Sequence, residues 1–281
     1  MRTLRWRIGS RTLECGPRTL VMGIVNVTPD SFSDGGWFLD HEAAVAHGLS
    51  LVEDGADILD VGGESTRPGS DEVEVEDELG RVLPVIKRLA ADVDVPVSID
   101  TRKAAVAGHA IDAGASIVND VSAGRDPGMF DLVRDAGVGL VLMHMLGEPK
   151  TMQQDPQYAD VVAEVHDYLA ERLQAAIDAG VPREAIALDP GLGFGKAFEH
   201  SMSLMRHNEK LLDLGAPLLV GPSRKSFIGE ALDGIPVTER AEGTAGAVAW
   251  LAIHGAHIVR VHDVRQIVRV LRVIDAIRGA E

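Results

Sequence analysis

The sequence contains almost no cysteine, few aromatic residues and no long apolar run. Cys15 is the only cysteine among 281 residues, so the chain cannot form an internal disulfide, and a reducing compartment is expected. Aromatic residues make up only 4%, which leaves an aliphatic core. No apolar stretch approaches the roughly 18 residues of a membrane span, and the opening MRTLRWRIGS lacks the apolar segment of a secretory signal. We therefore expect a cytoplasmic protein that does not enter membranes.

Basic residues are also scarce relative to acidic ones. The chain has 27 Lys and Arg against 43 Asp and Glu, a formal net charge of −16. Because duplex binding requires Lys and Arg to neutralise phosphates, this charge argues against a nucleic-acid partner. It does not exclude a small anionic ligand if the basic residues gather at a site. The acidic stretch at 71–78 is interpreted as a solvated approach to a helix.

Eight short apolar runs alternate with helical patterns along the chain. The runs are rich in Val, Ile and Leu, as expected for parallel strands that are buried on both faces; they lie at 19–27, 56–62, 95–100, 116–120, 138–144, 185–189, 217–221 and 257–262. Helical periodicity covers 41–54, 76–91, 103–113, 127–136, 158–179, 200–213, 238–254 and 263–279. Glycine follows several of these segments, as at a left-handed position after a last helical turn. Eight βα units predict an α/β fold, a (β/α)8 TIM barrel in one domain over 1–281, with an open doubly wound sheet as the alternative.

The first 16 residues have a different pattern. Apolar and polar residues alternate over 4–8 and again over 11–15, and Gly9-Ser10 lies between them. This spacing predicts a β-hairpin with a two-residue turn. We expect the hairpin to plug the N-terminal mouth of the barrel.

Polar residues end most of the apolar runs. In a barrel of this type the active site lies at the carboxyl ends of the strands, and the residues found there are Asn26, Asp100, Asn119, His144, Asp189, Arg260 and His262, with Ser223, Arg224, Lys225 and Ser226 in the loop after the seventh run. Strand alternation puts Ser98 on the same face as Asp100, and Arg260 on the same face as His262. Because the apolar face should meet the helices, the polar face is predicted to point into the barrel mouth.

The residue types at these positions indicate a class of ligand. Asp100, Asn119 and Asp189 suit a flat, nitrogen-rich heterocycle, because carboxylates accept charge-assisted hydrogen bonds from ring N–H and amino groups. Arg260 and His262 precede the last predicted helix, a position where barrels commonly bind phosphate. The sequence therefore predicts a heterocyclic ligand that carries an anionic group.

Each of these residues also has a structural interpretation. Asp100 could cap the helix that follows it, and Asn119 could belong to a turn. Met143 and His144 could pack at a strand end, and Arg260 could pair with a neighbouring acid. The glycine-rich segment GLGFGK at 191–196 matches neither of the common nucleotide-binding motifs.

Eight longer motifs follow one another along the chain. They are VMGIVNVTPDSFSDGG (21–36), DVGGESTRPG (60–69), SIDTRK (98–103), NDVSAG (119–124), LMHMLGEPKTMQ (142–153), DPGLGFGK (189–196), GPSRKSFIG (221–229) and VRVHDV (259–264). In this order they resemble the dihydropteroate synthases, a family of pterin-binding enzymes, and the first two motifs together are specific to it. The resemblance covers essentially the whole chain.

The resemblance implies a transferase of folate biosynthesis, of the class that sulfonamides target. Its reaction joins 6-hydroxymethyl-7,8-dihydropterin pyrophosphate to p-aminobenzoate, releases pyrophosphate and uses Mg²⁺. The resemblance further implies a homodimer, because family members are usually homodimers.

The same resemblance implies roles for individual residues. The pterin ring is expected to contact Asp100, Asn119, Asp189 and Lys225, and the pyrophosphate is expected to contact Asn26, Arg260 and His262, with Asn26 also at the metal. The p-aminobenzoate pocket is expected to include Phe194, Lys225 and Ser226, and Met143 and Gly221 are expected among the substrate-binding residues. Asp34 joins Asp100 and Lys225 as an expected catalytic residue, and two loops expected to close over the site carry Phe32 and Asp34, and Thr66, Arg67 and Pro68.

One departure from the family pattern is visible, and three alternatives remain. His200-Ser201 stands where the family usually has His-Asn, and because serine caps helices well we expect only a local structural effect. A methyltetrahydrofolate-type methyltransferase would not need the SRKSF motif or the Arg-x-His pair. A catalytically silent pterin-binding paralogue would be expected to lack Asp34 or Thr66-Arg67. A phosphosugar barrel would not explain the three predicted pterin ligands together.

Overall fold

The computed structural model describes residues 3–28, 37–65, 70–148 and 150–280. Within these ranges, eight strands form one parallel sheet, in the order β8-β7-β6-β5-β4-β3-β10-β9. A parallel bridge between Leu188 and Leu218 joins the two ends of this order, which closes the sheet into a barrel. The strands are β3 (Leu20–Asn26), β4 (Ile58–Gly62), β5 (Val97–Asp100), β6 (Ile117–Asp120), β7 (Gly139–Met143), β8 (Ile186–Asp189), β9 (Leu219–Val220) and β10 (Ile258–Val261).

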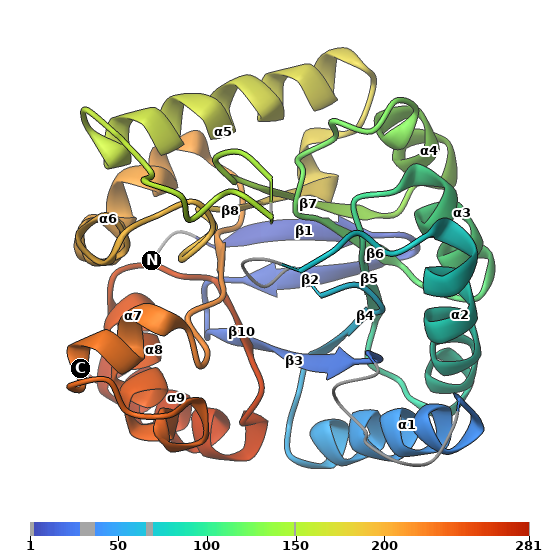
Figure 1. The fold of residues 1–281 in the computed structure, drawn as a ribbon, viewed down its shortest axis with the longest axis horizontal. Coiled ribbons are helices and arrows are strands. Elements are labelled where there is room, and N and C mark those ends of the chain that lie inside the picture. Colours follow the sequence, from blue (N-terminus) through green and yellow to red (C-terminus); the bar gives the residue numbers. More distant parts are fainter. Residues whose placement is uncertain (1–2, 29–36, 66–69, 149, 281) are drawn as a thin grey trace.

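Helices surround this barrel (Figure 1). The α-helices in the described residues are α1 (Trp37–Glu53), α2 (Val75–Asp92), α3 (Ala104–Asp112), α4 (Met129–Ala136), α5 (Val161–Asp178), α6 (Phe198–Arg206), α7 (Ser226–Ala231), α8 (Ala241–Ile253) and α9 (Val264–Arg278). Short 3₁₀ segments are η2 (Arg183–Ala185), η3 (Asn208–Leu214) and η4 (Val237–Glu239). The predicted (β/α)8 barrel is therefore confirmed.

Two details differ from the sequence expectation. The helix expected over 200–213 is two elements, because His207, at φ −112° and ψ 26°, ends α6 before η3 begins. Ser201 does not cap α6: it lies inside the helix with its side chain fully buried. At the helix start the backbone N–H of Ala197 donates to His200 Nδ1 at 3.2 Å. The expectation that Ser201 acts as a cap was therefore wrong.

The strands divide their side chains between two faces, as the period of two requires. Residues such as Val21, Leu59 and Ile99 belong to the large core between the sheet and the helices. Their neighbours fill the barrel interior near its N-terminal end with a second apolar cluster, here called the apolar layer: Leu20, Met22, Ile58, Ile117, Val141, Ala187, Leu219 and Ile258. The apolar layer makes the lower interior a packed core.

The N-terminal hairpin covers this end of the barrel. It consists of β1 (Leu4–Ile8) and β2 (Arg11–Cys15), antiparallel, with Gly9 at a left-handed φ of 66° in the turn. The buried side chains of Trp6, Ile8 and Cys15 pack against the apolar layer. The indole Nε1 of Trp6 donates to the carbonyl of Ala185 at 2.9 Å, so the buried polar atom has a partner. The predicted plug is therefore confirmed.

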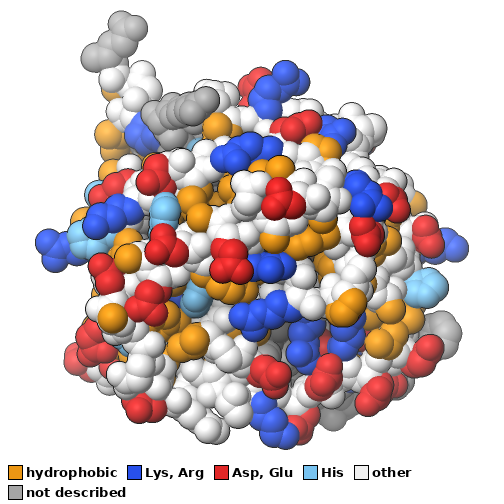
Figure 2. All heavy atoms as spheres, turned by 90° about the horizontal axis from the view of Figure 1, so that it is seen from above, with side chains coloured by type: hydrophobic (Ala, Val, Ile, Leu, Met, Phe, Trp, Pro, Cys, Tyr) orange, Lys and Arg blue, Asp and Glu red, His pale blue; other side chains and the backbone are white. Residues whose placement is uncertain are grey.

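The outer surface carries charges of both signs. Figure 2 shows the face seen from above in Figure 1, where acidic and basic side chains are interspersed with small groups of hydrophobic ones. Among the helices in the described ranges, none is both long and apolar enough to cross a membrane.

Candidate active site at the carboxyl ends of the strands

The barrel interior changes from apolar to polar two residues further along several strands. Ile58 of the apolar layer is followed by Asp60, Ile117 by Asn119, Ala187 by Asp189 and Ile258 by Arg260. Because alternate strand residues share a face, these side chains lie directly above the apolar layer. We call the polar layer the set Asp60, Asp100, Asn119, Asp189 and Arg260.

Arg260 crosses the interior to bind two acids of this layer. Its Nε donates to Asp60 Oδ2 at 2.6 Å and its Nη2 donates to Asp100 Oδ2 at 2.7 Å. Since β3 separates β10 from β4 in the sheet, these contacts span the barrel rather than join neighbouring strands. The structural alternative for Arg260, pairing with an acid, is confirmed, and this pairing leaves other guanidinium N–H groups for a ligand.

Two carboxylates thus share one guanidinium. Asp60 Oδ1 and Asp100 Oδ1 are buried and have no hydrogen-bond partner among the described residues. Burial raises the pKa of Asp100 well above its usual value; Arg260 opposes this, whereas Asp60 and Glu78 add to it. The capping alternative for Asp100 is wrong, because Lys103 is the residue that precedes α3.

Asp189 is the corresponding acid on the opposite side of the layer. Burial raises its pKa to about 6, against the opposing effects of a hydrogen bond from the backbone N–H of Gly191 and of the charge on Lys225. The Gly191 bond measures 2.7 Å to Asp189 Oδ1. Gly191 has φ +64°, and a Cβ there would lie 2.0 Å from the carbonyl oxygen of His144, so this turn requires glycine.

Lys225 and Phe194 meet at the mouth, from the loops after β9 and β8. The Lys225 Nζ lies 3.8 Å from the centroid of the Phe194 ring, a cation–π contact. Phe194 also packs on a small buried cluster that contains Met143. Gly221 lies beside Arg260, since a Cβ on Gly221 would be 3.7 Å from Arg260 Cβ, and Ser226 is exposed at the start of α7. The structure therefore brings these predicted residues to one end of the barrel.

His262 is neutral and oriented by a serine. Burial, Arg260 and Arg224 lower its pKa to about 3. Its backbone N–H donates to Ser223 Oγ at 3.2 Å, and its Nδ1 lies 3.0 Å from the same oxygen. The Ser223 hydroxyl still has its own proton to donate to Nδ1, and in that arrangement the imidazole proton is on Nε2. Arg224 is already occupied by a two-point ion pair with Asp263 at 2.5 and 3.0 Å.

Sequence reasoning missed Lys196, which is 3% exposed beneath the Phe194 loop. Its Nζ lies 2.8 Å from His144 Nδ1 and donates to the Phe194 carbonyl at 3.0 Å. Burial lowers the pKa of Lys196 to about 7 and that of His144 to about 3. His144 also meets the Tyr168 ring edge-on at 4.8 Å, which supports its structural interpretation as a packed residue.

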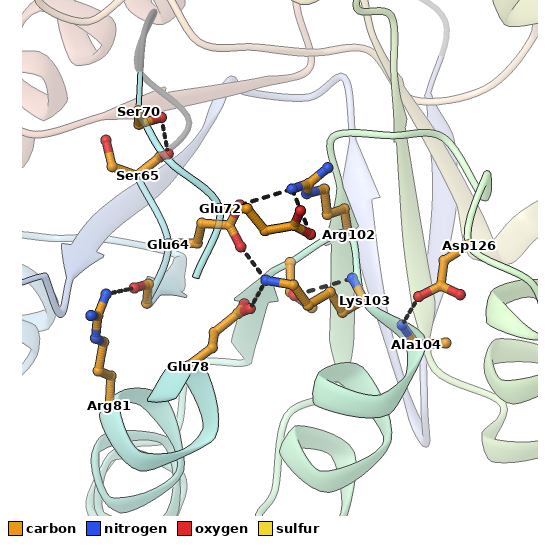
Figure 3. A network of polar contacts seen from close by, with 12 residues as sticks. Glu64, Ser65, Ser70, Glu72, Glu78, Arg81, Arg102, Lys103, Ala104 and Asp126 are labelled. Carbon is orange, nitrogen blue, oxygen red and sulfur yellow. Dashed lines mark hydrogen bonds and ion pairs between the residues drawn. The ribbon is translucent and has the colours of Figure 1, made fainter. Parts of the chain in front are cut away.

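A second ionic network lies beside Asp100 and is shown in Figure 3. Lys103 pairs with Glu64, in the segment after β4, and with Glu78 of α2 at 2.7 Å. Arg102 pairs with Glu64 at 3.3 Å and with Glu72 at 2.9 Å. A pocket beside this network is lined by Glu64, Glu78, Asp100, Thr101, Arg102 and Val121. The interpretation of 71–78 as wholly solvated was wrong at Glu78, which is fully buried because it neutralises Lys103.

Asp60 was also missed, although a signal for it existed. It is fully buried, and it is the only acid within the otherwise apolar segment ILDVG of β4. A charge inside a buried strand requires a partner, and the partner is Arg260.

Several predicted residues cannot be placed in this way. Asp34, Phe32, Thr66, Arg67 and Pro68 lie outside the described residues. Asn26 ends β3, partly buried and in register with Gly62 of β4.

Most of the chain matches known proteins. The profile of the pterin binding enzyme family matches residues 22–262. The chain is 46% identical over 261 residues to the dihydropteroate synthase of Escherichia coli K12, covering 93% of this chain and 92% of that protein. It is 48% identical over 263 residues to the enzyme of Mycobacterium leprae, covering 91% and 92%.

Solved structures agree with these sequence matches. The dihydropteroate synthase of Xanthomonas albilineans with 4-aminobenzoic acid superposes with a TM-score of 0.94 at 48% identity, covering 100% of both chains. The same enzyme in complex with 7,8-dihydropteroate gives 0.89 at 46% identity, covering 99% and 100%. A Yersinia pestis dihydropteroate synthase in a sulfonamide drug complex gives 0.92 at 40% identity, covering 99% and 100%.

The chain belongs to the dihydropteroate synthase family. It is a transferase that condenses 6-hydroxymethyl-7,8-dihydropterin pyrophosphate with p-aminobenzoate to give 7,8-dihydropteroate in folate biosynthesis. The reaction expected from the motifs is confirmed, and the methyltransferase and phosphosugar alternatives were wrong.

Proposed function

We propose that three residues of the polar layer, Asp100, Asn119 and Asp189, bind the pterin ring of the substrate as hydrogen-bond acceptors. The observation that carries this proposal is the convergence of these three side chains from β5, β6 and β8 above the apolar layer, with Asp100 Oδ1 buried and unpaired among the described residues. A 2-amino group and ring N–H offer the donors that such carboxylates accept. The X. albilineans relative was solved in complex with 7,8-dihydropteroate, which supports a pterin as the ligand of this fold.

The pyrophosphate group is assigned to Arg260 and His262. Arginine has five N–H donors, and Asp60 and Asp100 engage two of the nitrogens that carry them. His262 offers one further donor at Nε2 if Nδ1 accepts from Ser223 as assigned. Both lie just before α9, whose N-terminus adds positive potential.

Mg²⁺ fits the residues present only as an ion shared with the substrate. No group of three or more His, Cys, Asp or Glu side chains in the described ranges could hold a metal, whereas the Asn26 carboxamide provides one oxygen donor. Mg²⁺ commonly binds one or two protein oxygens together with phosphate oxygens and waters. When bound, the ion supplies charge neutralisation for the leaving pyrophosphate.

The reaction breaks the bond between the pterin methylene carbon and the pyrophosphate oxygen, and the electron pair leaves with pyrophosphate. The amine nitrogen of p-aminobenzoate bonds to the methylene carbon and then loses its proton. A neutral aniline is nucleophilic enough to need no strong base, so no residue is assigned as one. Asp100 would stabilise positive charge that develops on the pterin.

The second substrate is assigned to the mouth of the barrel. Phe194 offers a ring face and Lys225 a cation beside it, which suits an aromatic ring that carries a carboxylate. Ser226, Met143 and Gly221 complete this proposed pocket. From the motifs alone, Asp34, Thr66, Arg67 and Pro68 are proposed to belong to loops that cover both substrates.

A homodimer and a cytoplasmic location are proposed with this activity. The helices α8 and α9 pack together and expose four large apolar side chains: Trp250 (46%), Ile253 (59%), Val273 (60%) and Ile277 (67%). An exposed apolar patch of this kind supports self-association. A buried Cys15 as the single cysteine suits a reducing compartment.

The decisive experiment incubates the purified protein with the pterin pyrophosphate, p-aminobenzoate and Mg²⁺ and measures dihydropteroate and pyrophosphate. Both products are expected for the wild type, with on the order of a hundredfold loss of kcat/KM for Asp189→Asn. Pterin binding without pyrophosphate release would identify a silent paralogue. Unchanged kinetics for Asp189→Asn would contradict the assigned ring site.

A further inference from the structure

Asp60 is a buried acid that accepts hydrogen bonds from two residues, and these two residues are assigned to different parts of the substrate. Its Oδ2 accepts from Asn119 Nδ2 at 3.0 Å and from Arg260 Nε at 2.6 Å. The Asp60 side chain is 0% exposed, so solvent does not reach it. Asp60 therefore connects the assigned pterin ligand to the assigned pyrophosphate ligand without being exposed itself.

The contact with Asp60 fixes the orientation of the Asn119 amide. An ion pair with Arg260 requires the carboxylate form of Asp60, and a carboxylate can only accept hydrogen bonds. The amide nitrogen of Asn119 must therefore face Asp60, which leaves Asn119 Oδ1 as the atom offered to a ligand. Together with Asp100 and Asp189, this gives the polar layer three acceptors for the ring.

Asp60 also fixes the position of the Arg260 guanidinium. Asp60 and Asp100 hold Nε and Nη2 of one rigid plane, and the two-point contact restricts rotation about the last side-chain bonds. Loss of either acid would leave the guanidinium free to turn away from the assigned pyrophosphate.

We propose that Asp60 is a positioning residue that sets the acceptor pattern for the pterin ring through Asn119 and the direction of Arg260 toward pyrophosphate. The specificity of the site for a heterocycle rich in N–H donors thus depends on an acid that does not touch the substrate. This inference rests on the proposed roles of Asn119 and Arg260.

The test is a double-substitution cycle with steady-state kinetics. Asp60→Asn replaces the acceptor by a group that can also donate, so the Asn119 amide loses its fixed orientation. The KM for the pterin pyrophosphate is expected to rise about tenfold or more, with the KM for p-aminobenzoate changed less than about twofold. In an Asn119→Ala background the same substitution should raise the pterin KM by a clearly smaller factor, because the route through Asn119 is gone and only the route through Arg260 remains. An equal factor in both backgrounds would overturn the route through Asn119.

Asp57→Asn is the matched control from the same part of the chain. Asp57 immediately precedes β4, pairs with Arg18 and accepts from Val21 N at 2.9 Å, so it too links an arginine and an N–H donor. It lies at the opposite end of the barrel, and its substitution should lower stability without changing the pterin KM. A pterin KM raised equally by both substitutions would overturn the positioning role.

A second variant separates positioning from a general packing defect. Asp60→Glu keeps an acceptor-only carboxylate but adds a methylene to a filled site, which costs stability. Its pterin KM should lie nearer the wild-type value than that of Asp60→Asn, and the reverse order would overturn the proposal. If Asn119→Ala alone leaves the pterin KM unchanged, the proposed ring site fails; if it raises the KM and Asp60→Asn does not, only the inference fails.

Discussion

Asp57 and Asp60 lie three residues apart, yet they belong to opposite ends of the barrel. Asp57 forms an ion pair with Arg18 and accepts from the backbone of β3. Asp60 pairs with Arg260, and its Oδ1 has no partner among the described residues. The first contact links secondary-structure elements, whereas the second leaves buried acceptor capacity beside the proposed substrate site.

The same contrast separates the hairpin end from the mouth. At the hairpin end Trp6 fills the opening and its one polar atom has a partner in Ala185. At the mouth, acids buried above the apolar layer have raised pKa values. A buried carboxylate oxygen that lacks a partner costs stability, and Asp60 Oδ1 and Asp100 Oδ1 are two such atoms side by side at the mouth, which indicates that this end is specialised for binding.

The largest expected effect is at the hairpin end. Trp6→Ala should reduce the free energy of unfolding by about 3–5 kcal/mol, because a fully buried indole leaves a cavity. Trp6→Phe, which keeps most of the apolar volume but loses the bond to Ala185, should cost less. Chemical denaturation measures both, and the KM values of the folded fraction should match the wild type. A rise in the pterin KM of the folded Trp6→Ala protein would contradict a purely structural role for the hairpin end.

At the mouth, Lys225→Ala should impair activity and leave stability nearly unchanged, the reverse of Trp6→Ala. The kcat/KM is expected to fall by about a hundredfold through lost substrate contacts, with a small change in unfolding free energy. Lys87→Ala on the exposed surface of α2 is the control. Near-normal steady-state kinetics for Lys225→Ala would remove this residue from the site.

The pH dependence of kcat/KM should follow the titration of the buried acids at the mouth. Burial raises the pKa of Asp189 to about 6 and raises that of Asp100 further above its usual range. As pH falls from about 8 to about 5, both lose the acceptor form, so kcat/KM for the pterin substrate should decrease. Their effect on the free energy of unfolding runs in the opposite direction to their effect on kcat/KM. The stabilising contribution of the two protonated acids is fully present below the unfolded-state pKa and is lost as pH rises through the folded-state pKa. A kcat/KM that stays constant to pH 5 would contradict this assignment.

The smallest effect is expected away from both ends. Arg88 forms an exposed ion pair with Asp92 on α2, and surface pairs contribute little because water screens them. Arg88→Ala should leave the thermal midpoint and the kinetics unchanged within error. A clear loss of activity would show that the site extends beyond the mouth.

Periodicity was enough to predict the strands, the hairpin and the faces of Asp100, Asn119 and Arg260, because local chain geometry determines all of them. It could not predict that Arg260 binds Asp60, 200 residues away, since that contact exists only once the barrel has closed. The burial of Glu78 with Lys103 depends in the same way on how α2 and α3 approach each other. The split between α6 and η3 depends on the backbone at His207, for which the sequence has no glycine or proline signal.

The central claim is that substrate recognition belongs to the polar layer and structural support to the opposite end. Calorimetric titration of the pterin pyrophosphate with Mg²⁺ into the wild type, Asp57→Asn and Asp189→Asn tests it directly, with thermal unfolding of the same samples. We predict that Asp57→Asn lowers the thermal midpoint and keeps wild-type affinity, whereas Asp189→Asn keeps or raises the midpoint and loses affinity by at least about tenfold. Wild-type affinity for Asp189→Asn, or weakened binding by Asp57→Asn, would contradict the claim.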